Sequence, residues 1–243
     1  MCFDDDSAPP IPPISGAAVS HADLTLEASD GNTFAAFLAE ADGEPAAGVV
    51  ILPDVRGLYR FYEELALRFA ERGITALAFD YFGRTAGVKK RDNDWDFMPL
   101  VQQLTMQQVQ ADVGASVGHL RSLGCDSIFT VGFCYGGSGS WAAAASGHGL
   151  AGAVGFYGRP GRMIDLVPEL DAPILALQAG ADEHILPEHN AAFDEALSRA
   201  GVEHDVVVYD GAPHSFFDRK QAQFADASDD AWSRVLAFVE RYA

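Results

Sequence analysis

The segment 131–137, Val-Gly-Phe-Cys-Tyr-Gly-Gly, limits most narrowly what this chain can fold into. It joins an apolar run over residues 127–133 to a stretch of small residues over 138–146. A Gly-x-Cys-x-Gly spacing at such a junction is typical of a nucleophile elbow, in which a strand turns sharply into a helix. Glycines are needed there because the residue at the tip has a strained backbone and larger neighbours would collide. The sequence therefore predicts a strand, a tight turn and a helix, with the Cys134 thiol at the tip.

Cys134 also has a plainer interpretation. Free cysteines are commonly buried and inert, so this one is equally consistent with a small apolar side chain in a strand–helix turn. At an elbow, by contrast, the positive end of the helix dipole favours the thiolate. Partner residues elsewhere in the chain have to distinguish the two interpretations.

Apolar runs and helical patterns alternate along the chain. Residues 22–26 and 33–38 predict an antiparallel opening hairpin across the turn at 29–32. Before it, residues 1–19 are expected to form an extended lead-in, in which the proline-rich residues 7–14 are expected to be poorly ordered. Further strands are predicted at residues 48–52, 74–79, 127–133, 151–157, 173–178 and 204–209, and helices at 61–71, 102–123, 188–200 and 226–242. This order predicts a mostly parallel sheet with helices on both faces, in one α/β domain spanning residues 1–243.

Composition narrows the possible partners. With 16 basic and 35 acidic residues the formal net charge is -19, which repels nucleic acid and anionic membranes. The N-terminus lacks the features of a signal peptide, and no apolar run approaches a membrane span. Three cysteines are too few and too scattered for a disulfide framework or a zinc site. We expect a cytoplasmic monomer or small homo-oligomer that acts on a small molecule without a metal or organic cofactor.

Two polar residues follow predicted strands at the edge where ligands bind in such sheets. Asp182 comes after the strand at 173–178, and His214 after the strand at 204–209. The chain order Cys134, Asp182, His214 is the nucleophile–acid–base order of α/β-hydrolases. His214 would take the thiol proton and later protonate the leaving group, while Asp182 would orient the imidazole. The sequence therefore predicts a catalytic triad, and His184, which lies in a loop beside the acid, is a weaker candidate base.

An oxyanion hole requires two preorganised backbone N–H donors. Tyr135, directly after the nucleophile, is expected to supply one of them. Val55, in the loop after the strand at 48–52, is expected to supply the other. The competing interpretation of that loop, residues 53–57, is an ordinary Asp/Gly turn.

The cysteine elbow, the segment 211–216 (Gly-Ala-Pro-His-Ser-Phe), Asp54 and the segment 80–85 (Asp-Tyr-Phe-Gly-Arg-Thr) together resemble the dienelactone hydrolase family. The resemblance runs from about residue 22 to the C-terminus and implies an α/β-hydrolase fold. It also implies that Arg84 binds the carboxylate of a lactone acid, although Arg84 is equally well explained as a surface partner of a nearby acid.

The resemblance has two departures. Asp54 stands where the family has a glutamate that holds the resting thiol neutral and then accepts its proton. The aspartate is one methylene shorter, so activation would fall to His214. Asp218 stands where a second arginine is usual, which weakens the case for a small dicarboxylate-like lactone acid and would favour neutral esters.

Aromatic residues near the predicted strand ends are candidate pocket walls. Tyr135 and Phe216 are assigned to the substrate site on this basis and Tyr157 is a further candidate wall, against the alternative that these aromatics belong to the core. The resemblance adds Asp54 and Arg84 to the expected substrate-binding residues. The connection 89–100, with Trp95, is expected either to cover the site or to be a surface excursion.

These observations favour a hydrolase that cleaves a lactone or small carboxylic ester through an acyl-thioester intermediate. A broad-specificity carboxylesterase of the same fold and a non-catalytic small-molecule-binding relative remain alternatives. A redox sensor is disfavoured, because Cys125 and Cys134 are expected at opposite ends of one strand, too far apart for a disulfide.

Overall fold

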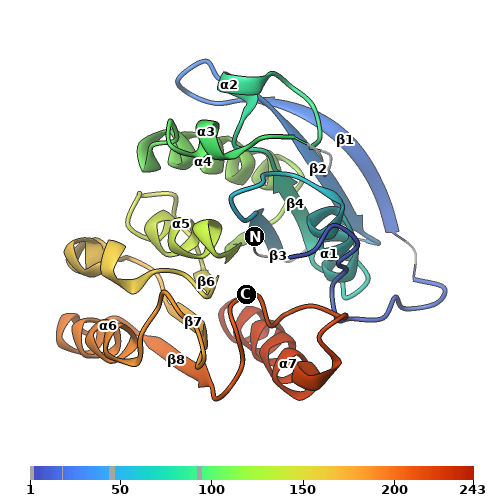
Figure 1. The fold of residues 1–243 in the computed structure, drawn as a ribbon. Coiled ribbons are helices and arrows are strands. Elements are labelled where there is room, and N and C mark those ends of the chain that lie inside the picture. The colour runs from blue at the N-terminus through green and yellow to red at the C-terminus, as the bar shows by residue number, and fades with distance from the viewer. Residues whose placement is uncertain (1–2, 18, 44–46, 92–94) are drawn as a thin grey trace.

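Eight strands form one sheet in the order β1-β2-β4-β3-β5-β6-β7-β8 (Figure 1). The computed structural model describes residues 3–17, 19–43, 47–91 and 95–243. β1 pairs antiparallel with β2 and β2 with β4, whereas the remaining neighbours are parallel. The strands are β1 (Val19–Glu27), β2 (Thr33–Ala41), β3 (Ala47–Leu52), β4 (Thr75–Phe79), β5 (Ser127–Phe133), β6 (Gly152–Phe156), β7 (Ile174–Ala179) and β8 (His204–Tyr209). The predicted α/β-hydrolase class, mostly parallel with an antiparallel N-terminal hairpin, is confirmed.

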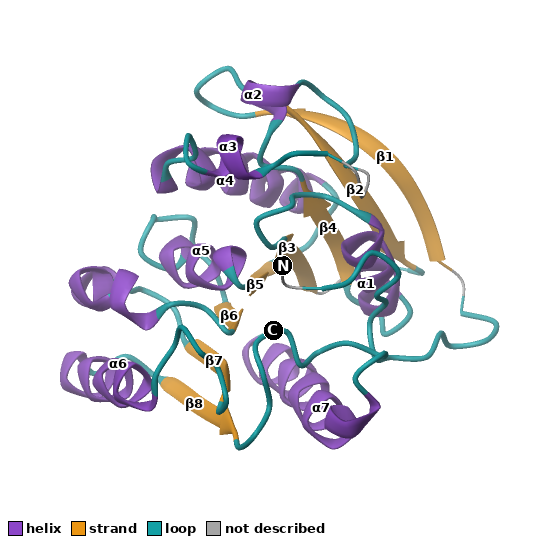
Figure 2. Ribbon diagram, viewed as in Figure 1, coloured by secondary structure: helices purple, strands orange, loops and turns teal. Residues whose placement is uncertain are grey.

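Helices cover both faces of the sheet (Figure 2). α1 (Arg60–Ala70) and α7 (Ala225–Tyr242) pack on one face, and α4 (Met106–Ser122), α5 (Tyr135–Ala143) and α6 (Pro187–Ala200) on the other. None of the described helices is both long and apolar enough to span a membrane. Shorter elements are α2 (Gly83–Ala86), α3 (Met98–Val101) and the 3-10 turns η1 (Pro160–Arg162), η2 (Ile164–Glu169) and η3 (Ala222–Phe224).

β3 shows why the sequences of the central strands are unbroken apolar runs. Val49 and Ile51 belong to the core beneath α1 and α7, while Val50 and Leu52 belong to the core beneath α4 and α5. All four side chains are fully buried. A parallel strand covered on both faces has no solvent side, so polar residues do not alternate along it.

One helix boundary was predicted wrongly. The periodicity suggested a helix from residue 102, but α4 begins at Met106. Thr105 caps it: its side chain accepts from the Gln108 N–H at 3.3 Å, and the Gln108 side chain accepts from the Thr105 N–H at 3.1 Å. This capping box is a signal that was present in the sequence. It leaves the chain between α3 and α4 to form part of a pocket wall.

The described residues of the N-terminal lead-in pack against the rest of the domain. Phe3 is buried and stacks on Phe61 of α1 with ring centroids 4.1 Å apart. The Ser7 hydroxyl donates to the Asp218 carboxylate at 2.8 Å, and Ala8 O accepts from a backbone N–H at 3.1 Å. Proline content indicated an extended backbone, but apolar side chains every few residues decide whether such a segment packs. Residues 1, 2 and 18, including Cys2, lie outside the described residues.

Candidate active site

Cys134 occupies the turn between β5 and α5 with φ 56° and ψ -108°. Such a left-handed conformation is strained for any residue except glycine and persists only when the surroundings enforce it. Two glycines make the turn possible. A Cβ at Gly132 would lie 1.8 Å from the Gly136 carbonyl oxygen, and a Cβ at Gly136 would lie 2.1 Å from the Leu52 carbonyl oxygen. The strand, turn and helix predicted for this segment are therefore confirmed.

Asp182 and His214 meet beside the turn. His214 Nδ1 lies 2.5 Å from Asp182 Oδ2. The second carboxylate oxygen, Oδ1, accepts the backbone N–H groups of His184 at 2.8 Å and Ile185 at 3.2 Å. Burial alone would raise the pKa of Asp182, but these hydrogen bonds outweigh it and hold the pKa below its ordinary value. The carboxylate is therefore fixed in position and ionised.

His214 interacts with both predicted partners. Burial acts to lower its pKa, but the hydrogen bond to Asp182 and the interaction with the Cys134 sulfur outweigh burial and raise the pKa to about 9. At neutral pH the imidazole therefore carries a proton while it faces the sulfur. In general, a protonated imidazole beside a cysteine sulfur stabilises the thiolate, which is the nucleophilic form of the side chain.

Backbone strain gathers around this histidine. Within the described chain, the non-glycine residues with positive φ are Cys134, Tyr157 and Ser215. Ser215 follows His214 directly, and the Tyr157 ring lies 4.8 Å from the imidazole ring. Strained residues cluster where a site requires a particular geometry, and here all three adjoin the same imidazole.

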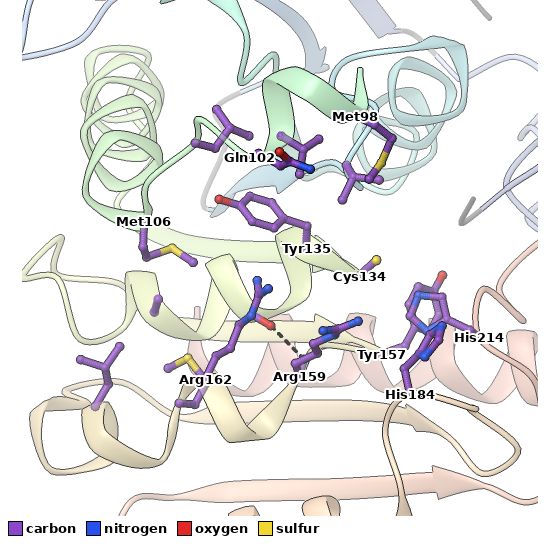
Figure 3. Close-up of a pocket in the computed structure, with 17 residues that line it drawn as sticks. Met98, Gln102, Met106, Cys134, Tyr135, Tyr157, Arg159, Arg162, His184 and His214 are labelled. Atoms are coloured by element: carbon purple, nitrogen blue, oxygen red, sulfur yellow. Dashed lines mark hydrogen bonds between the residues drawn. The ribbon is translucent and has the colours of Figure 1, made fainter. Parts of the chain in front are cut away.

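A pocket of about 910 Å³ opens over Cys134 and His214 (Figure 3). Tyr135, Val55 and Tyr157 line it, as the sequence predicted. Part of the connection 89–100 also reaches it, although residues 92–94 lie outside the described residues. The apolar wall consists of Met98, Val101, Leu104, Met106, Met163 and Leu166.

The two predicted oxyanion donors remain available. Among the described residues, the backbone N–H groups of Tyr135 and Val55 donate to no protein acceptor. Tyr135 is the first residue of α5, where no preceding turn offers a carbonyl. Both residues border the pocket at Cys134.

Asp54 does not reach the pocket wall that the described residues form. Its side chain is fully buried, and its carboxylate accepts from Arg56 Nη2 at 3.0 Å and from the Arg56 backbone N–H at 2.9 Å. Gly57 N–H closes the turn onto Asp54 O at 3.1 Å. Residues 54–57 thus form an Asp/Gly turn, as the alternative held for Arg56 and Gly57, and Val55 within it borders the pocket.

Arg84 is likewise turned away from the pocket. It pairs with Asp30 at 2.8 Å and with Asp112 of α4 at 2.9 Å. Burial raises the pKa of Asp112 to about 6 even though Asn32 and Arg84 donate to its carboxylate. A buried carboxylate requires such donors, and Arg84 is one of them. The contacts of Arg84 therefore match the alternative in which it pairs with a nearby acid.

Phe216 and Asp218 are also structural in this geometry. Phe216 is fully buried and packs against Tyr157 at 5.7 Å and Tyr209 at 4.9 Å. It supports the pocket wall from behind instead of touching a ligand. Asp218 is buried against Ser7. Asp218 does not line the pocket, so the preference for neutral esters expected from its charge has no structural basis.

Sequence reasoning missed two arginines that line the pocket, Arg159 and Arg162, and His184, the weaker candidate base, lines it as well. The same signal that pointed to Asp182 was available for the arginines, since both follow the carboxyl end of β6 within a few residues. Among the described residues, no group of three or more His, Cys, Asp or Glu side chains is arranged to hold a metal ion.

Comparisons with known proteins indicate the family to which this chain is similar. The model of the dienelactone hydrolase family matches residues 34–243. A Yersinia pestis protein provisionally assigned as a carboxymethylenebutenolidase is 28% identical over 237 residues, which cover 91% of this chain and 89% of the relative. A carboxymethylenebutenolidase of Rhodococcus opacus is 27% identical over 265 residues, covering 100% and 97%.

Solved structures share the fold. A provisionally assigned dienelactone hydrolase from Klebsiella pneumoniae superposes with a TM-score of 0.78 at 25% identity, over 93% of this chain and 100% of the other. A dienelactone hydrolase-like promiscuous phosphotriesterase from metagenomic libraries reaches a TM-score of 0.81 at 21% identity, over 93% and 99%.

Proposed function

Because the chain belongs to the dienelactone hydrolase family and is a hydrolase, we propose that it cleaves a lactone or carboxylic ester with Cys134 as the nucleophile. The observation that carries this proposal is the convergence of three groups on one pocket. Cys134 stands at a strained elbow, and His214 interacts with it while bonding Asp182 at 2.5 Å.

In the first half of the reaction, Cys134 Sγ attacks the carbonyl carbon. The developing oxyanion is held by the N–H groups of Val55 and Tyr135, which donate to no other described acceptor. The carbon–oxygen bond to the alcohol then breaks, and the alcohol takes the proton from His214 Nε2. An acyl-thioester on Cys134 remains. When the substrate is a lactone, the alcohol stays tethered to the acyl group.

In the second half, neutral His214 takes a proton from water as the water attacks the thioester. The carbon–sulfur bond breaks, the carboxylic acid leaves, and the thiolate–imidazolium pair is restored. Asp182 keeps Nδ1 protonated throughout, so Nε2 is the atom that exchanges protons. No step requires a metal or organic cofactor.

The dimensions of the pocket favour a second candidate, a broad-specificity carboxylesterase. At about 910 Å³ the pocket lies near the upper end of the range for drug-sized ligands, about 300–1,000 Å³. Much of its wall is flexible methionine and leucine, which adapt to varied shapes. A small lactone acid would leave most of this volume unfilled.

Purified protein with dienelactone and with p-nitrophenyl acetate tests the proposal, with Cys134→Ala as the matched variant. Turnover of either substrate that Cys134→Ala abolishes supports the cysteine mechanism. Turnover of the simple ester alone selects the carboxylesterase. A binding role without catalysis is indicated if Cys134 forms no acyl-enzyme with the activated ester.

A further inference from the structure

Arg159 and Arg162 introduce positive charge into a pocket whose wall is mostly apolar. Both follow β6, and η1 holds them on the wall opposite the connection that carries Met98 (Figure 3). The Arg159 backbone N–H donates to Ser138 Oγ of α5 at 2.8 Å, which ties this segment to the elbow helix. The Arg162 guanidinium lies 5.8 Å from the Tyr135 ring centroid, within cation–π range. The Arg159 backbone and the Arg162 guanidinium are therefore held against α5, and both solvent-exposed side chains line the pocket that contains Cys134.

Neither arginine is neutralised by the protein. Within the described residues, neither guanidinium forms an ion pair with a carboxylate, and the pocket wall contains no aspartate or glutamate. Arg56, Arg84 and Arg91, by contrast, each bind a buried carboxylate. In a chain with a net charge of -19, an acid-free wall with two arginines is an unusual place. Such a pocket concentrates anions.

The positions at which the family resemblance implies anion-binding arginines do not supply a free guanidinium group in this chain. Arg84 is bound to Asp30 and Asp112, and Asp218 occupies the position of the second family arginine. An anionic group on a substrate in this pocket would therefore meet Arg159 and Arg162. Guanidinium groups bind carboxylates through paired charge-assisted hydrogen bonds.

We propose that Arg159 and Arg162 form a carboxylate subsite, and that the preferred substrates are elongated esters with an acidic group remote from the ester bond. The apolar wall accommodates the chain between the two groups, and the pocket volume admits a chain longer than that of a small lactone acid. This inference rests on the proposed hydrolase function and specifies its substrate class.

The test compares two esters that differ only at the end of the acyl chain: p-nitrophenyl hexanoate and mono-p-nitrophenyl adipate, which carries a terminal carboxylate. We expect the native protein to have the higher kcat/KM for the adipate ester. In the double variant Arg159→Gln/Arg162→Gln this preference, the ratio of the two kcat/KM values, falls on the order of 10- to 100-fold through the KM for the adipate ester. Arg162→Lys keeps part of the preference, because it keeps the charge but loses the planar fork.

Arg199→Gln is the control variant, since Arg199 is an exposed arginine on α6. It should leave the ratio of the two kcat/KM values unchanged. Equal turnover of the two esters by the native protein, or an unchanged ratio in the double variant, overturns the subsite and leaves the hydrolase intact. Turnover of neither ester overturns both proposals.

Discussion

Asp182 Oδ2 and His214 Nδ1 lie 2.5 Å apart, although the two residues are separated by 32 positions in the chain. The contact orients the imidazole and helps to raise its pKa to about 9. In the proposed mechanism it thereby determines which nitrogen faces Cys134 and over what pH range that nitrogen carries a proton. The first two predictions follow from this pair.

The first prediction concerns the pH profile of ester hydrolysis. His214 must be protonated to release the alcohol, so kcat/KM should fall as the pH rises, with an apparent pKa of about 9. Asp182→Asn removes a carboxylate that stabilises the imidazolium, so the alkaline limb should move toward lower pH and kcat should decrease. Steady-state kinetics across this range give the result. An alkaline limb that stays in place in Asp182→Asn would contradict the assignment.

The second prediction links the same group to stability. The pKa of His214 is higher in the folded protein than the ordinary histidine value of 6.5, so its proton stabilises the fold. This contribution is complete below about pH 6.5 and is lost as the pH rises to about 9. Denaturant titrations should show the free energy of unfolding falling across this window, on the order of 1–3 kcal/mol more in the native protein than in His214→Gln.

The third prediction concerns thiol reactivity. Burial raises the pKa of Cys125 to about 11, whereas Cys134 is partly exposed beside a protonated imidazole. Iodoacetamide at neutral pH should therefore alkylate Cys134 well before Cys125. Peptide mass spectrometry over time measures both rates. His214→Gln should slow labelling at Cys134 on the order of tenfold, whereas equal labelling of the two thiols would argue against an activated Cys134.

The fourth prediction tests the elbow glycines. Gly136→Ala places a methyl group against backbone oxygens of Leu52 and Pro53, at 2.1 and 2.4 Å, which neither a rotamer nor a flexible neighbour can relieve. We expect a loss of at least about 4 kcal/mol in the free energy of unfolding, or failure to fold. Gly118→Ala is the matched control on α4, where an added Cβ meets nothing within 4 Å. It should stabilise the protein by about 0.5–1 kcal/mol in thermal or denaturant unfolding.

The fifth prediction concerns the N-terminal segment. Phe3 is buried against Phe61 and also packs edge-on against Phe133 and Tyr157, with ring centroids 6.4 and 6.5 Å apart. Phe3→Ala should cost about 3–5 kcal/mol in unfolding free energy, since it leaves a cavity behind Tyr157. Ile14→Ala in the same segment alters an exposed side chain and should change stability by less than about 0.5 kcal/mol. Similar effects for the two variants would mean that the segment does not pack as described.

The local pattern of the sequence was sufficient to predict much of the fold. Unbroken apolar runs such as 127–133 indicated strands buried on both faces, and β5 has those bounds. Glycine spacing identified the elbow, because the steric demand of that turn is local. The start of α4 was missed although Thr105 and Gln108 encode it, because helical periodicity was weighed above the capping signal.

For the site as well, the sequence identified some features and only the tertiary structure decided the others. The sequence alone determined the residue types, their order and their positions after strands, which single out Cys134, Asp182 and His214 because parallel strands end at one edge. Only the tertiary structure decided the partners of each charged side chain. Arg84 forms an ion pair with Asp112, and Arg56 forms one with Asp54. Asp218 accepts a hydrogen bond from Ser7. Arg159 and Arg162, by contrast, line the pocket. The pairing of a charge depends on which buried groups lie within a few ångströms of it, and distant segments supply those groups.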